Sequence, residues 1–139
     1  MITQTLCNVF KLNLLKGLED FDTGSVYTYK IALYDAVANL NENTTVYTTT
    51  NEVTGSGYTA GGEILTKVSP TLSGSTAIVT FSNVTWNPAS FTTRGALIYN
   101  ATTNAAVAVL NFGEDKTAVN TFTVTFPTAN STNAIIRIS

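Results

Sequence analysis

Apolar residues recur every four positions near the start of the chain, at Leu6, Phe10, Leu14 and Leu18. A four-residue apolar period is typical of one face of an amphipathic helix. The pattern predicts a helix over residues 5–18, and Gly17 lies where a glycine favours a C-terminal cap. Packing on the domain itself explains the apolar stripe most simply, and docking of the helix on a partner is the alternative.

From residue 26 onward the apolar period changes to two, or to short apolar runs, and both patterns are typical of β-strands. Thr121–Phe126 is the clearest example, with three apolar residues on one side and three threonines on the other. We expect strands over residues 26–34, 45–50, 58–68, 76–84, 95–99, 105–112, 121–126 and 134–138, with turns at 70–74 and 100–104. About seven to eight short strands at this spacing predict one all-β domain over residues 1–139, a β-sandwich or jelly-roll-like fold with one N-terminal helix.

The composition excludes several classes of function. Charged residues make up 12% of the chain, about half the usual share, and the net charge is -2, so binding to nucleic acid or to an anionic membrane is not expected. The chain contains no histidine, which excludes a Ser-His-Asp triad and a His-ligated zinc site. The single cysteine, Cys7, excludes an intrachain disulfide and is expected to be a buried, inert thiol.

No stretch of the chain indicates membrane insertion, because the apolar runs are far shorter than the roughly 20 residues that span a bilayer. No secretory signal is visible at the N-terminus.

The missing histidine and the single cysteine predict a protein that is not an enzyme and that needs no cofactor and no metal.

Three short motifs resemble ligand sites, but the residues around them favour loops. Gly55–Ala60 matches a dinucleotide-binding pattern, yet a strand and not a helix is expected to follow it. Glu19, Asp20 and Asp22 fit no register of a calcium-binding loop, and a solvated turn is expected there. The charged run Glu114–Lys116 is likewise expected to form a turn.

Two residue types are rare enough in this chain to be singled out. Trp86, the only tryptophan, is expected to pack in the core or at a sheet edge rather than to form a ligand platform. Arg94 is expected to bind backbone carbonyls or a carboxylate and so to fix a loop.

Several segments resemble a family of small virion proteins of tailed bacteriophages. They are Tyr29–Tyr34 (YKIALY), Tyr47–Gly62, Phe91–Asn100 (FTTRGALIYN) and Ala106–Lys116 (AVAVLNFGEDK), together with the opening helix and its acidic turn. The resemblance covers roughly residues 9–138. It implies a structural component of the particle, similar to capsid decoration or cement proteins.

This resemblance implies partners and a location. The expected partners are the major capsid protein and copies of the chain itself, as a dimer or trimer, and the expected location is the head surface of the virion. The alternative is a tail, neck or fibre accessory module that binds a receptor or carbohydrate. Because loops tolerate specialisation while strands hold the core, the candidate interface residues lie in or beside loops. They are Asn41, Asn43, Asn51, Glu52, Tyr58, Trp86 and Arg94, and the N-terminal helix is the reserve candidate.

Overall fold

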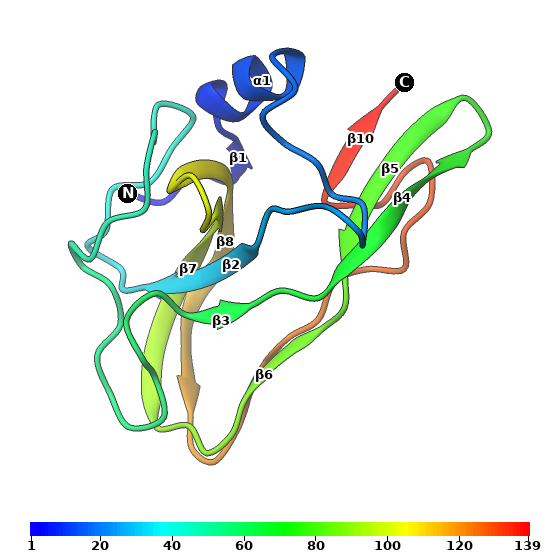
Figure 1. Ribbon diagram of the computed structural model, residues 1–139. Helices are drawn as coiled ribbons and strands as arrows, with labels where there is room; N and C mark the ends of the chain where they lie inside the picture. The colour runs from blue at the N-terminus through cyan, green and yellow to red at the C-terminus, as the bar shows by residue number, and fades with distance from the viewer.

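The computed structural model describes residues 1–139 and has one short helix and ten β-strands (Figure 1). This confirms the predicted all-β domain with an N-terminal helix. The elements are β1 (Thr5–Leu6), α1 (Asn8–Leu15), β2 (Tyr29–Tyr34), β3 (Glu63–Ile64), β4 (Lys67–Ser73), β5 (Thr76–Phe81), β6 (Val84–Trp86), β7 (Phe91–Asn100), β8 (Ala105–Ala118), β9 (Phe122–Val124) and β10 (Ile136–Ile138). The count exceeds the predicted one because residues 58–68, expected as one strand, contain β3 and the start of β4, and because β1 and β6 were not expected as separate strands.

The largest sheet contains five antiparallel strands in the order β1-β8-β7-β2-β3. Its centre is the hairpin of β7 and β8, which turns at residues 101–104 as the sequence predicts. Residues 95–100 and 105–109 are buried without alternation, because both faces of this sheet are covered. Phe10 of α1 is buried in the core, and the ring of Tyr47 stacks 4.7 Å from that of Tyr99 on β7.

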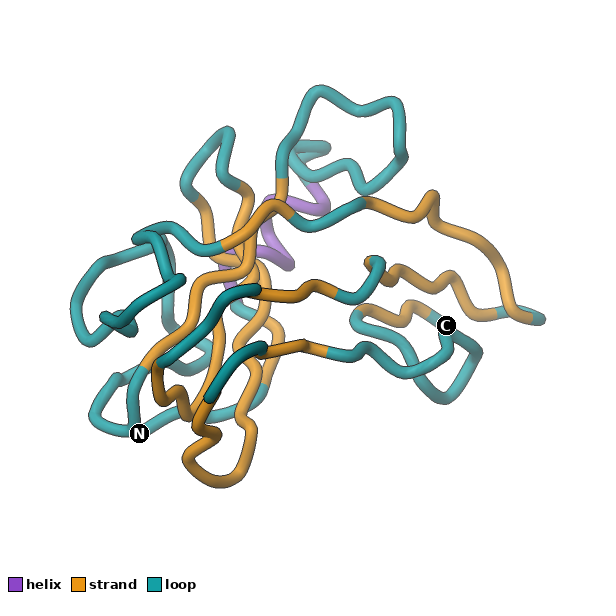
Figure 2. The backbone as a smooth tube through the Cα atoms, turned by 90° about the horizontal axis from the view of Figure 1, so that it is seen from below, coloured by secondary structure: helices purple, strands orange, loops and turns teal.

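Two smaller antiparallel sheets, β10-β5-β4 and β6-β9, complete the domain. Figure 2 shows the first of them projecting to one side of the main sheet. The turn expected at residues 70–74 is only the pair Gly74–Ser75, because Pro70 lies inside β4. The register of β4 shifts between Val68 and Thr71, and such a bulge accommodates a proline that cannot donate to the ladder.

The helix is shorter than the predicted 5–18 range because Thr5 and Leu6 pair with β8 as a strand. Gly17, at φ 73°, follows its C-terminus as predicted. Of the expected apolar stripe, only Phe10 is fully buried, whereas Leu18 is 44% exposed. Packing on the domain therefore explains only part of the stripe. α1 is too short to cross a membrane, and the structure contains no other helix.

Two further expectations differ from the structure. Residues 45–50 do not form a strand, and only Val46 makes an isolated bridge, to Ala105. The strand expected at 105–112 continues to Ala118, so Glu114–Lys116 is not a turn between strands. Glu114 and Asp115 lie in a bulge of β8 opposite Arg94, and Lys116 pairs with Thr93 of β7.

Candidate functional site

Five of the seven predicted interface residues lie between β2 and β3, in residues 39–62, which we call the loop segment. These residues form turns and isolated bridges without a helix or strand of their own. The surrounding strands nevertheless hold them closely. The hydroxyl of Tyr34 on β2 donates to the carbonyl oxygen of Thr48 at 2.6 Å, and the N–H of Val53 donates to the carbonyl of Leu33 at 2.9 Å.

The carboxylate of Glu52 is the internal anchor of the loop segment. Glu52 is 8% exposed, so it offers little surface to a partner. One carboxylate oxygen accepts a hydrogen bond from the Tyr47 hydroxyl at 2.5 Å. The other accepts bonds from the Tyr58 hydroxyl and, at 2.8 Å, from the N–H of Gly61. The carbonyl of Gly61 in turn accepts a bond from Tyr99 on β7 at 2.7 Å, which ties the anchor to the main sheet.

The tyrosines around Glu52 remain hydrogen-bond donors at all physiological pH values. Burial, followed by the hydrogen bond to Glu52, raises the pKa of Tyr47 and of Tyr58 well above the ordinary range. The Glu52 carboxylate accepts hydrogen bonds from three donors and is held in one position by them. These hydrogen bonds to the buried Glu52 carboxylate hold the backbone of the loop segment in one conformation.

Trp86 lies in the core beneath Tyr58, and its side chain is 1% exposed. Its ring centroid is 6.3 Å from that of Tyr58 and 5.9 Å from that of Phe122. The prediction that Trp86 packs in the core is confirmed, and almost none of its surface is exposed to a partner. Tyr58 is half-buried, so it offers a partner only part of its surface.

The outer side of the loop segment is polar, and Glu42 is its only exposed charged residue. Asn43 and Asn51 are exposed as predicted, and Asn41 is half-buried. Asn41 and Asn43 lie in an open hollow of about 330 Å³ that residues 39–48 form, and no charged residue lines it. The Asn41 side chain accepts a bond from the N–H of Asn43 at 2.8 Å, so this side chain stabilises its own turn.

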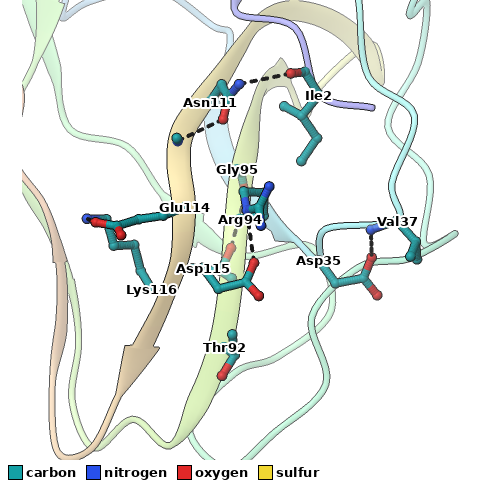
Figure 3. A network of polar contacts seen from close by, with 12 residues as sticks. Ile2, Asp35, Val37, Thr92, Arg94, Gly95, Asn111, Glu114, Asp115 and Lys116 are labelled. Atoms are coloured by element: carbon teal, nitrogen blue, oxygen red, sulfur yellow. Dashed lines mark hydrogen bonds and ion pairs between the residues drawn. The ribbon is translucent and has the colours of Figure 1, made fainter.

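Arg94 belongs to a different surface, on the outside of β7 and β8. Its Nε lies 2.9 Å from a carboxylate oxygen of Asp115, and the two side chains face one another in Figure 3. Lys116 pairs with Glu114 at 2.8 Å beside them and lowers the pKa of Glu114. The predicted structural use of Arg94, binding a carboxylate, is confirmed. Its side chain is 35% exposed, and it does not join the loop segment.

Replacing Arg94 with alanine should have a small effect. An ion pair that water reaches on both sides contributes about 0–1 kcal/mol, and the bulge itself is held by backbone pairing. We expect the free energy of unfolding of Arg94→Ala, measured in urea, to fall by less than about 1 kcal/mol. The variant Lys116→Ala is the matched control and should behave alike. A loss several times larger for Arg94→Ala alone would show that Arg94 fixes more than the bulge.

Glu19 is a buried polar residue that the sequence did not reveal. The expected solvated turn is correct for Asp20 and Asp22, which are exposed, but Glu19 is 7% exposed. Its Oε2 accepts a bond from the Tyr29 hydroxyl at 2.9 Å, while Oε1 has no partner. Burial raises the pKa of Glu19, against the weaker opposing effects of the hydrogen bond from Tyr29 and of the neighbouring Asn100 side chain.

This raised pKa predicts an unusual dependence of stability on pH. The pKa of Glu19 is higher in the folded protein than the unfolded value of 4.5. Protonation of Glu19 therefore stabilises the folded state relative to the unfolded state. The resulting stabilisation is complete below the unfolded pKa and is lost as pH rises through the folded pKa. We therefore expect the free energy of unfolding of the wild type, measured in urea, to fall as pH rises from the unfolded pKa of Glu19 through the folded one. The free energy of unfolding of Glu19→Gln should not fall over this pH range. The control Glu63→Gln, at an exposed position, should follow the wild type, and an equally flat wild-type curve would contradict the prediction.

The glycine-rich motif at residues 55–60 forms a loop in the structure. Residues 55–60 are followed by strand β3 and not by a helix, so the loop interpretation is confirmed. A Cβ atom on Gly62, at φ 77°, would lie 1.8 Å from the carbonyl oxygen of Ile31, which explains the need for glycine there.

Cys7 is fully buried, as predicted, and burial raises its pKa to about 11. No three His, Cys, Asp or Glu side chains lie together as metal ligands would.

Comparisons with known proteins give no relative from which a role could be transferred. A scan of protein-family models found no match to this chain, and searches of curated proteins and of solved structures found none either.

Proposed function

We propose that this chain is a structural protein of a tailed-bacteriophage virion, which binds the assembled head and stabilises it as a cement protein. The observation that carries the proposal is the loop segment, whose polar outer side, with Glu42 as its one exposed charge, is held in one conformation by the buried Glu52 anchor. A surface that is already ordered loses little conformational entropy on binding. The resemblance of four segments to phage virion proteins supports the same role.

The chemistry of the surface also supports a binding role without turnover. Contacts made by amides and hydroxyls depend less on salt than contacts between exposed charges. The proposed partners are the major capsid protein and further copies of this chain on the head surface. Each contact is modest, but a symmetric shell repeats it many times, so the summed effect on the particle is large.

A module on a tail, neck or fibre that binds a receptor or carbohydrate is the second candidate. The polar hollow at residues 39–48 favours it, since asparagine and threonine side chains can hydrogen-bond to sugar hydroxyls. The same hollow has no aromatic residue in its lining for a sugar ring to stack on, and Trp86 is buried. We therefore place this candidate second.

The proposal predicts that particles without this protein lose their DNA at a lower temperature than complete particles. Adding back the purified chain should restore the wild-type midpoint of DNA release, measured with an intercalating dye during heating. The variant Asn43→Arg, which adds a bulky charge to the exposed side of the loop segment, should not restore it.

The control for that experiment is Asn133→Arg, at an exposed asparagine outside the loop segment. It should protect particles as well as the wild type does. If particles with and without the protein release DNA at the same temperature, the cement role is wrong. If Asn43→Arg protects fully, the loop segment is not the contact surface.

A further inference from the structure

α1 presents apolar side chains to the outside of the domain. Leu12 is 52% exposed and Leu15 is 87% exposed, and Leu18, just beyond the helix, is exposed as well. Leu12 and Leu15 are three positions apart, so their side chains are neighbours on one face of the helix. Phe10 holds the opposite face on the core. In Figure 1, α1 lies at the outer boundary of the domain.

Two lysines flank these leucines. Because an α-helix turns by about 100° per residue, Lys11 and Lys16 lie on either side of the pair formed by Leu12 and Leu15. Both lysines are exposed, and neither makes an ion pair or a side-chain hydrogen bond. α1 contains no acidic residue. These four residues, which we call the helix face, are therefore apolar along the centre and positively charged along both sides.

The residues that follow α1 carry the opposite charge. Asp20 and Asp22, which we call the acidic turn, are both exposed. One oxygen of Asp20 accepts a bond from the N–H of Asp22 at 3.0 Å, and neither carboxylate makes an ion pair. The exposed Leu18 lies between the helix and this turn in the sequence. Residues 11–22 therefore carry an apolar, basic surface and an acidic one in a single short stretch.

We propose that the chain forms a two-fold symmetric dimer in which the helix faces of two copies pack antiparallel on one another. A two-fold interface brings the same surface of both copies together, so that surface must be complementary to itself. With the axis between them, Leu12 of one copy packs against Leu15 of the partner subunit. The first turns of one helix then lie beside the residues that follow the other helix, which brings Lys11 near the acidic turn of the other copy.

Charge complementarity is the reason for a second copy as the occupant. Any partner needs an apolar surface to cover the leucines and carboxylates beside it to pair with the lysines. The chain supplies both at residues 18–22, and the symmetric arrangement forms each contact twice. An anionic membrane would also attract the lysines, but it would repel the acidic turn beside them.

The interface is small, so the dimer is weak. A helix of eight residues is about 12 Å long, which is too short to bury the roughly 1,200 Å² of a stable interface. We expect a dissociation constant between about 0.1 and 1 mM. The inference concerns the isolated chain and its test needs no phage particle, so it and the proposed function can fail separately.

The first test is a concentration series of the full-length, nitrogen-15-labelled chain up to about 2 mM, followed by NMR and by sedimentation equilibrium. We expect a monomer–dimer equilibrium, with concentration-dependent amide shifts in residues 8–22. Leu15→Ser should leave no detectable dimer. Leu72→Ser makes the same change at an exposed leucine of β4, outside the helix face, and should dimerise as the wild type does.

Reversal of charge tests the pairing of lysine with the acidic turn. Lys11→Glu and Asp22→Lys should each weaken dimerisation at least about threefold, because each places like charges opposite one another twice in the dimer. An equal mixture of the two variants should recover most of the lost affinity, since opposite charges then face one another again.

Three results would each overturn the proposal. They are a monomer at every concentration, concentration-dependent shifts confined to residues outside 8–22, and a mixture of Lys11→Glu and Asp22→Lys that associates no better than either variant alone. The substituted positions are exposed. The wild-type series decides the question even if one variant fails to fold.

Discussion

Replacing Glu52 with alanine is expected to destabilise the domain by about 2–4 kcal/mol, more than any other substitution in the loop segment. The Glu52 side chain accepts bonds from the hydroxyls of Tyr47 and Tyr58 and from the N–H of Gly61. The substitution leaves these three donors without their acceptor in a site that is almost closed to water. The free energy of unfolding in urea measures the loss.

The matched control is Glu42→Ala, at the other glutamate of the loop segment, which is exposed and whose side chain makes no hydrogen bond in the structure. It should change stability by no more than about 0.5 kcal/mol. Amide hydrogen exchange should also become faster in residues 53–62 of Glu52→Ala and remain unchanged in Glu42→Ala. Equal stability of the two variants would show that Glu52 does not anchor the loop segment.

Replacing Trp86 with alanine should cost about 3–5 kcal/mol, because it leaves a cavity among aromatic rings that cannot close fully around it. The rings nearest to it are those of Tyr58, Phe91 and Phe122, all within 6.4 Å between centroids. Thermal unfolding by circular dichroism provides the measurement, since this variant has no tryptophan left to report by fluorescence.

The variant Trp86→Phe separates packing from hydrogen bonding. The indole N–H is buried and has no hydrogen-bond partner, so its removal sacrifices no bond. Phenylalanine also keeps one aromatic ring in place. We expect this variant to lose less than half of what the alanine variant loses. Equal losses would mean that the second ring of the indole accounts for nearly all of the packing energy.

The parts of the fold that the sequence predicts are those where burial leaves a local pattern. Thr121–Phe126 alternates because one side of it is buried, and the structure places Val124 inside and Thr123 outside. The continuation of β8 to Ala118 was not predictable in this way. Gly113 and the charges after it are ordinary turn signals, and only pairing with β7 turns them into a bulge.

The candidate site was harder to predict because its contacts cross the fold. Five of the proposed residues do gather in the loop segment, since polar loops are recognisable from composition. The Glu52 site is joined to the main sheet by the hydrogen bond from Tyr99 to Gly61, and Tyr99, which is 47 positions from Glu52 in the sequence, lies there only when β7 pairs with β2. The one sequence feature that could have indicated this site is an acidic residue, Glu52, between Tyr47 and Tyr58 in a nearly uncharged segment.

The central claim is that the chain binds the assembled head of a phage particle, and locating it by electron cryomicroscopy tests this most directly. Particles that contain the protein should be compared with particles that lack it. We predict difference density the size of one domain at repeated positions on the head surface, with the loop segment of each copy against the capsid lattice. Difference density confined to the tail or its fibres, or no difference between the particles, would contradict the claim.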